Sequence, residues 1–278
     1  MKDSRSLPVI ELIGRMAKRH LGGIIAAGFL FVVLVLVVFP GAFTAYDPNG
    51  TSPTEGMQPP SSLHWFGTDQ LGRDLFTRVL YGGGETIKAA VIALGIAVAA
   101  GLIIGILSGY SGGAVDTVLM RFTDVWLAIP GLLLSITLVT AIGFGTVPVA
   151  IAIGIGMTPA FVRTVRSEVI KVKVSPFIEA ARAGGDSSLR IALTHVLPNS
   201  LRPVAVMALL DSGGVIMGVA TLSFLGFGAQ PPSPEWGSLI NDGRDYLMTA
   251  PWLSLLPGTV VVFTVLSITV IGISIQKR

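Results

Sequence analysis

A serine nucleophile with a histidine base is one chemistry that the residue types of this chain allow, and one stretch has a hydrolase-like spacing. Gly109-Tyr110-Ser111-Gly112-Gly113 matches the pattern G-x-S-x-G. A nucleophilic serine needs a base, usually histidine, within hydrogen-bond reach. The three histidines are His20, His64 and His195, and none lies in a membrane span predicted below. A Gly/Ser turn between helices is the favoured interpretation, and an intramembrane serine protease is the alternative.

Metal and nucleotide sites lack their usual motifs. Zinc sites need clustered ligands, and the three histidines lie in separate regions without a partner ligand three or four residues away. The phosphate-binding loop G-x-x-x-x-G-K-[ST] is absent because no Gly-Lys pair occurs. We therefore predict no metal, no cofactor and no catalytic residue, and we expect another chain to bind any ATP that is used.

Composition indicates a membrane protein. Of the 278 residues, 51% are hydrophobic and 13% are charged, whereas soluble domains carry roughly 25% charge. The polar groups needed to cover a water-soluble globule are missing, which excludes an ordinary soluble enzyme and a disordered chain. A net charge of +3 is too small a bias to predict a nucleic-acid partner, and with 0 cysteines the redox compartment cannot be read.

Charge-poor stretches predict an all-α protein with six membrane spans, since about 20 apolar residues cross a bilayer. The stretches are 21–46, 89–115, 125–162, 203–227 and 252–275. The third is too long for one helix and breaks at Gly143-Phe144-Gly145 and Pro148, so it supplies two spans. The first is longer than a signal-peptide core, which favours an uncleaved anchor.

Basic residues predict the orientation of the spans. Fourteen Lys and Arg residues lie in 1–20, 163–202 and the last two positions, against three in the opposite loops 41–85 and 227–251. Both termini and segment 163–202 are therefore predicted to be cytoplasmic, as an even number of spans requires. The predicted organisation is a cytoplasmic segment 1–20, a first span 21–45, an extracytoplasmic loop 46–85 and a core 86–278 with five spans.

The cytoplasmic segment 174–204, called the elbow below, predicts two short helices. Its pieces are a first helix over 177–183 that begins after Pro176, a break at Gly184-Gly185, a cap at Asp186 or Ser187, a second helix over 188–196 and a stop at Pro198. Such an elbow could enter a groove on a partner protein, and a solvated amphipathic loop is the alternative.

The elbow resembles the EAA loop of ABC importer permeases. The matching pattern is Glu179-Ala180-Ala181, three residues, Gly185, nine residues, and then His195-Val196-Leu197-Pro198. Further stretches are similar to the dipeptide/oligopeptide/nickel group of these permeases, in the subunit type with one span before the outer loop and five after it. They are HWFGTDQLGRD at 64–74, GYSGG at 109–113, LSFLGFG at 222–228 and EWG at 235–237.

The resemblance implies a type I importer permease fold in a prokaryotic inner membrane. It also implies a second permease subunit, two ATPases beneath the pore, and an extracytoplasmic binding protein that delivers di-/oligopeptides or a related small solute. ATP-driven closure of the ATPases would move the elbow and reverse the pore's opening. The implied coupling residues are Glu179, Ala180, Ala181, Arg182 and Gly185, with Leu197 and Pro198 anchoring the elbow to the fifth span.

The resemblance leaves the substrate open. Members often carry Glu three residues before the Leu of LSFLG, whereas this chain has Val219. A self-sufficient secondary transporter is a further alternative, but such transporters show inverted repeats and charged residues inside their spans. We find no inverted repeat here and few charges inside the predicted spans.

Asp211 is the acidic residue inside the fifth predicted span. A mid-membrane carboxyl is costly and should face the helix bundle or a water path. It is a candidate for the solute pathway or a partner-chain contact, and structural hydrogen bonding is the alternative. Arg121 and Asp124, spaced i, i+3 near the cytoplasmic end of the third span, are expected to pair with each other.

Four residues of the outer loop, Trp65, Asp69, Arg73 and Asp74, are candidates for docking the binding protein. A different interpretation applies to the three charged members. Asp69, Arg73 and Asp74 could instead form a local charge network that shapes the loop.

Overall fold

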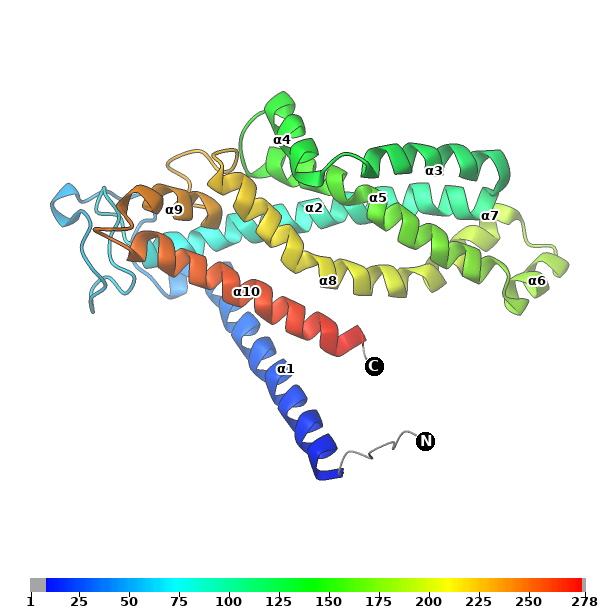
Figure 1. The fold of residues 1–278 in the computed structure, drawn as a ribbon, viewed down its shortest axis with the longest axis horizontal. Helices are drawn as coiled ribbons and strands as arrows, with labels where there is room; N and C mark the ends of the chain where they lie inside the picture. Colours follow the sequence, from blue (N-terminus) through cyan, green and yellow to red (C-terminus); the bar gives the residue numbers. More distant parts are fainter. Residues whose placement is uncertain (1–8, 277–278) are drawn as a thin grey trace, which may run out of the picture.

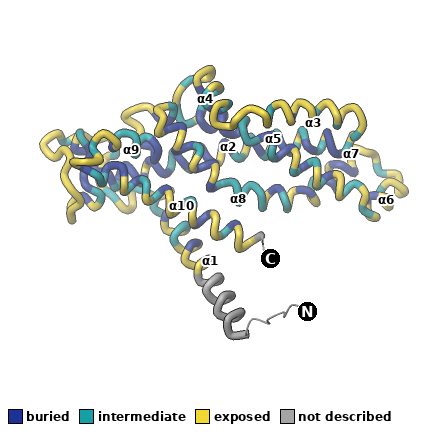
Figure 2. Tube along the Cα trace, in the orientation of Figure 1, coloured by how far each residue is buried: buried dark blue, intermediate teal, exposed yellow. Residues whose placement is uncertain are grey.

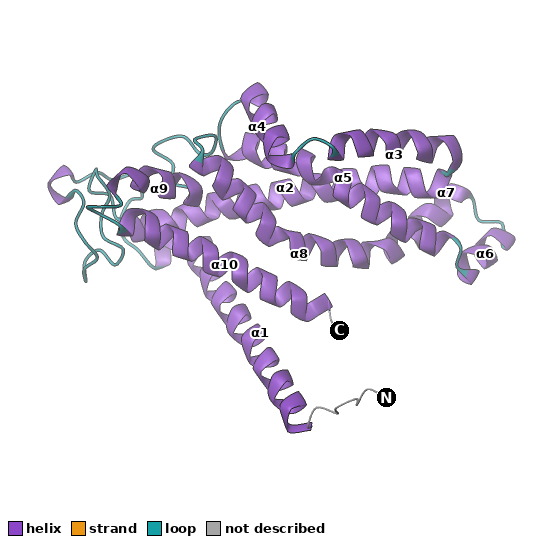
Figure 3. Cartoon of the chain, viewed as in Figure 1, coloured by secondary structure: helices purple, strands orange, loops and turns teal. Residues whose placement is uncertain are grey.

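The computed structural model describes the backbone of residues 9–276 and the side chains of residues 22–275. These described residues form helices joined by loops, with one isolated β-bridge between Thr68 and Asp74 and no strand (Figure 3). The longer helices are α1 (Val9–Val38), α2 (Leu75–Ser111), α3 (Gly113–Leu127), α4 (Gly131–Ile142), α5 (Thr146–Lys173), α8 (Leu197–Phe224) and α10 (Trp252–Gln276). The shorter ones are η1 (Pro40–Ala42), η2 (Pro53–Glu55), α6 (Pro176–Ala183), α7 (Ser188–Ile191), η3 (Ala192–Val196), α9 (Trp236–Gly243) and η4 (Arg244–Tyr246). The all-α prediction is confirmed.

Four helices of the described residues are long and apolar enough to cross a membrane, and the bent pair α3 and α4 adds a fifth candidate. The apolar part of α1, Gly22–Val38, is shorter. These findings are compatible with six spans, and the count of six stays a prediction. The basic segment 1–20 and the last two residues, Lys277 and Arg278, lie outside the described side chains.

The third predicted span is not one continuous helix. Helices α3 and α4 meet at a bend of 90° across residues 128–130. Pro130 is the cause, because a proline disfavours helical backbone at the residue before it. The break at Gly143-Phe144-Gly145 is confirmed, since α4 ends at Ile142 and α5 begins at Thr146. Helix α2 begins at Leu75, so its first turns lie within the predicted outer loop 46–85.

Helices α2 and α5 pack closely because glycines recur every fourth residue on α2. A Cβ atom on Gly101 would lie 2.5 Å from the Cβ of Phe161, and one on Gly105 would lie 2.6 Å from the Cβ of Val165. Gly109 repeats the contact one turn further, against α5. Small residues at this spacing let helix backbones approach in a membrane, where packing rather than water exclusion drives association.

The molecule is elongated, with different structures at its two ends (Figure 1). The loop 39–74 and α9 lie at one end, called the outer end below, and α6 lies at the opposite end beyond α5 and α7. Helix α10 packs on α1, α8 and α9. The buried residues follow the contact between α2, α5 and α8, whereas exposed residues predominate in α3 and in residues 22–38 of α1 (Figure 2).

Proline 198 does not end a helix, contrary to the sequence prediction. Helix α7 passes into the π-helical turn η3 and then into α8, so that the chain stays helical from Ser188 to Phe224. Pro198 is the second residue of α8. The wider π-turn just before it supplies backbone geometry that accommodates the ring and the missing N–H.

Candidate functional site

The elbow is held to the body of the molecule by buried apolar side chains. Ile178 of α6 is 0% exposed, and Ile191 and Val196 are buried with it. They join one cluster with side chains of α5 that include Val165 and Val169. Burying a side chain of this size stabilises its position by about 1.5–3 kcal/mol. The elbow is therefore a packed structure rather than a solvated loop.

The turn between α6 and α7 closes with the hydrogen bonds of a Schellman motif. The N–H of Asp186 donates to the carbonyl of Ala181 over 3.1 Å, and the N–H of Gly185 donates to Arg182 over 3.0 Å. Gly185 has φ +87°, the left-handed conformation that favours glycine. The predicted break and cap are confirmed, and the cap is Ser187, whose Oγ accepts from the N–H of Arg190 over 3.3 Å.

The predicted coupling residues lie on or beside the exposed face of this elbow. Glu179, Ala180, Arg182 and Gly185 are exposed, and Ala181 is half-buried. With small residues beside two opposite charges, this face can accept a close-fitting partner surface. Leu197 is half-buried and Pro198 is exposed at the start of α8. The apolar contacts that hold α6 in place come from Ile178, Ile191 and Val196, and the anchoring role of Leu197 and Pro198 stays a prediction.

Next to the elbow, ion pairs join α3 to α5. Arg166 donates to both carboxylate oxygens of Asp116, over 2.5 Å and 2.6 Å, and Ser108 of α2 also donates to Asp116. The expected pair between Arg121 and Asp124 is wrong, because Asp124 accepts from Arg163 over 2.6 Å. The packing of α3 against α5 determines this pairing, and the i, i+3 spacing within α3 could not predict it.

The glycine-serine motif lies at the same end. Helix α2 ends at Ser111, and Gly112 and Gly113 follow with φ of +70° and +55°. This is the turn between α2 and α3 that the sequence favoured over a serine nucleophile. Lys173 of α5 donates to the carbonyl of Tyr110 over 2.5 Å, which fastens the turn to α5.

The outer loop places its charged residues inside a local network. Asp69 accepts from Arg73 Nε over 2.6 Å, and Asp74 caps α2 by accepting from the N–H of Thr77 over 2.8 Å. His64 Nδ1 lies 2.8 Å from the Asp74 carboxylate. All of these charged side chains are buried, so the structure favours the network interpretation for Asp69, Arg73 and Asp74. Trp65 is the predicted docking residue that stays exposed, at 62%.

Asp211 lies in α8 and is half-buried. No hydrogen bond or ion pair joins its carboxylate to another side chain among residues 22–275. The role of Asp211 in a solute pathway therefore stays a prediction.

Sequence reasoning missed several residues that organise these regions. Ile178 lies inside the elbow, and its signal is that of a large apolar residue in a short, otherwise exposed helix. Arg78 was counted only as a basic residue of the outer loop, and it is 3% exposed. The pair between Asp116 and Arg166 joins residues 50 positions apart, and nothing in the linear sequence marks it.

Comparison with known proteins gives independent evidence about the family of this chain. Residues 101–278 match the family described as "Binding-protein-dependent transport system inner membrane component". The chain is 38% identical over 251 residues to a probable D,D-dipeptide transport system permease protein of Escherichia coli K12, covering 90% of this chain and 84% of that protein. It is 40% identical over 239 residues to a dipeptide transport system permease protein of Alkalihalophilus pseudofirmus, covering 86% of this chain and 79% of the relative.

A glutathione transport system permease protein of Escherichia coli O6:K15:H31 is 38% identical over 271 residues, covering 97% of this chain and 89% of the relative. Among solved structures, an inward-facing MetNI methionine ABC transporter gives a TM-score of 0.58 at 18% identity, covering 72% of this chain and 95% of that chain. An amino acid ABC transporter gives 0.55 at 15% identity, covering 72% and 94%. Similarity at this level of identity supports the fold alone.

Proposed function

This chain belongs to the binding-protein-dependent transport system inner membrane component family, and from that membership we propose how it works. It is a membrane permease subunit of an ABC importer. With a second permease it forms the pathway for a di- or oligopeptide or a related small solute, and it takes ATP-driven motion from two ATPase subunits through the elbow. It carries no catalytic residue of its own.

The elbow's geometry is the observation that carries this proposal. Its exposed face bears Glu179, Ala180 and Arg182, while Ile178 on the opposite side is locked into the contact with α5. A push on the exposed face would therefore move α5 and α8 as packed helices rather than deform a loose loop. Packed elements of this kind pass displacement between sites because their cores are dense.

The substrate class in the proposal comes from the relatives, whose names specify dipeptides, D,D-dipeptides and glutathione. The loop 39–74 and α9 face the outside of the cell in this proposal, both termini face the cytoplasm, and the exposed Trp65 side chain contacts the binding protein. The elbow, at the opposite end, then faces the ATPases (Figure 1).

Copurification tests the coupling role. The tagged chain is expressed in its host, extracted in mild detergent, and its partners are identified by mass spectrometry. We expect wild type to bring down a second permease and ATPase subunits. The variant Glu179→Arg should lose most of the ATPases and keep the second permease, because a reversed charge on the exposed face disturbs only that contact.

A matched control is Glu55→Arg, since Glu55 is an exposed glutamate at the outer end. This variant should retain the ATPases. Loss of ATPases from both variants, or from neither, would contradict the proposed role of the elbow.

A further inference from the structure

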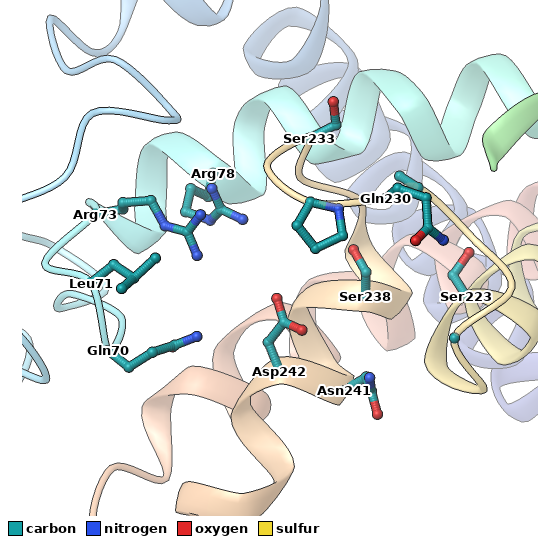
Figure 4. Close-up of a pocket in the computed structure, with 13 residues that line it drawn as sticks. Gln70, Leu71, Arg73, Arg78, Ser223, Gln230, Ser233, Ser238, Asn241 and Asp242 are labelled. Carbon is teal, nitrogen blue, oxygen red and sulfur yellow. The ribbon is translucent and has the colours of Figure 1, made fainter. Parts of the chain in front are cut away.

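A polar pocket of about 350 Å³ opens at the outer end of the chain (Figure 4). The lining comes from the turn 70–73, the first turns of α2, the end of α8 with the loop 226–233, and one face of α9. Ser238, Asn241 and Asp242 of α9 are spaced so that they share that face. This volume lies at the small end of ligand sites, which span about 300–1,000 Å³, so the pocket fits a small solute.

Two guanidinium groups lie side by side on one wall of this pocket. Arg73 and Arg78 both point toward it (Figure 4). They share a single carboxylate behind them, because Asp69 Oδ2 lies 2.6 Å from Arg73 Nε and 3.5 Å from Arg78 Nε. One negative charge between two positive charges leaves a positive excess at the wall.

Arg78 is held rigidly but is not fully satisfied. Its side chain is 3% exposed, and Nη1 donates to the carbonyls of Pro48 over 2.7 Å and Pro232 over 3.4 Å. Its Nε is buried without a hydrogen-bond partner. Asp69 Oδ2, 3.5 Å away, is the ionic partner of that nitrogen, so Arg78 lines the pocket with a fixed orientation.

The opposite wall carries the complementary charge. Asp242 faces the two arginines across the pocket (Figure 4), and no nitrogen–oxygen distance of 4.0 Å or less joins it to either of them. Burial raises the pKa of the Asp242 carboxyl, while the Arg78 and Arg73 guanidinium groups oppose that rise.

We propose that this pocket binds a small dipolar solute, with its carboxylate on Arg73 and Arg78 and its ammonium group on Asp242. Charge-assisted hydrogen bonds to arginine have the strength and geometry to orient a carboxylate. That the solute is a peptide rests on the proposed function, whereas the binding of a dipolar molecule does not.

Isothermal titration calorimetry of the full chain in mild detergent tests the pocket with dialanine as the probe. Two blocked forms, N-acetyl-dialanine and dialanine amide, each lack one charge and should bind at least about tenfold more weakly than dialanine. Acetate alone should bind more weakly still. These comparisons use the unaltered protein, so they do not depend on whether a variant folds.

Variants then locate the site. Asp242→Asn should weaken dialanine binding about tenfold, because the ammonium group loses its partner. It should not weaken N-acetyl-dialanine, which has no ammonium group, and removal of a negative charge near Arg73 and Arg78 should strengthen that anion's binding. The matched control is Asp245→Asn, since Asp245 is exposed three residues further on and does not line the pocket. It should bind dialanine as wild type does.

Three outcomes would overturn the proposal: no binding of dialanine to the folded chain, equal binding of dialanine and its blocked forms, or equal binding by wild type and Asp242→Asn. The importer assignment is tested separately. If dialanine binds but Glu179→Arg keeps its ATPases, the pocket proposal stands and the role of the elbow fails. If dialanine does not bind but the copurification gives the expected result, the role of the elbow stands and the pocket proposal fails.

Discussion

At the scale of single residues, the buried carboxylate of Glu235 shows how one contact joins distant segments. Its side chain is 0% exposed, caps α9, and accepts from the Thr86 hydroxyl of α2 over 2.7 Å. Trp236, the next residue, donates its Nε1 to the carbonyl of Val79 over 2.9 Å. Glu235-Trp236-Gly237 thus fixes the position of α9, and with it the wall of the outer pocket.

Removing the Thr86 hydroxyl tests this contact. Burial raises the pKa of Glu235, and the hydrogen bond from Thr86 opposes the rise by favouring the charged form. Thr86→Val should lower the free energy of unfolding by about 1–3 kcal/mol, because a buried acceptor loses its donor. The loss should be larger at high pH than at low pH, since the ionised carboxylate depends on that donor more than the neutral form does.

Thermal unfolding in detergent at several pH values measures the effect. The control is Thr137→Val, because the exposed Thr137 hydroxyl bonds only to the carbonyl of Leu133 in its own helix. Equal melting temperatures for Thr86→Val and wild type at high pH would refute the role given to this hydrogen bond.

At the scale of elements, the elbow depends on one left-handed residue. Gly185 has φ +87° with open space where a Cβ would lie, whereas its neighbour Gly184 has the right-handed φ of −73°. The two adjacent glycines therefore differ in backbone conformation rather than in crowding. Only the second one requires glycine.

The two glycines should therefore respond differently to replacement by alanine. Gly185→Ala should destabilise the end of α6 by about 1–2 kcal/mol, the cost of left-handed backbone for a residue with a Cβ. Gly184→Ala should have little effect, since alanine adopts right-handed helical backbone readily. Hydrogen exchange of the Gly185 and Asp186 amides, which close the turn, measures the difference. Equal exchange rates in the two variants would count against the Schellman closure.

At the scale of the whole molecule, the two ends carry different structures. The outer end holds buried charge networks and the polar pocket, and the other end holds the elbow and the ion pairs around Asp116. The span between them is apolar and glycine-packed along α2 and α5. An importer that receives solute at one side of the membrane and is driven by ATPases at the other needs its solute-binding and coupling regions at opposite ends.

The proposed orientation can be tested by labelling, because the chain has 0 cysteines. Two single-cysteine variants, Glu55→Cys at the outer end and Arg182→Cys on the elbow, replace exposed residues. A membrane-impermeant maleimide should label the first in intact cells and the second only after permeabilisation. Unaltered chain, which has no thiol, is the control for background, and the reverse pattern of labelling would invert the topology.

The sequence by itself determined the helical class, the elbow's turn and the family resemblance. These features are local: apolar stretches long enough to span a bilayer, a Gly-Gly break and a Ser187 cap each act within a few residues. The family match over residues 101–278 agrees with the resemblance found in those motifs. Local signals of this kind do not depend on how the helices are arranged in space.

Only the tertiary structure decided which charges pair and where a pocket forms. Asp124 bonds to Arg163, which is 39 positions away, and not to Arg121 on its own helix. Arg73 and Asp242 meet at one pocket although the sequence places them in separate loops. The physical reason is that side-chain pairing follows helix packing, and packing is fixed by contacts such as Gly105 against Val165 that join remote parts of the chain.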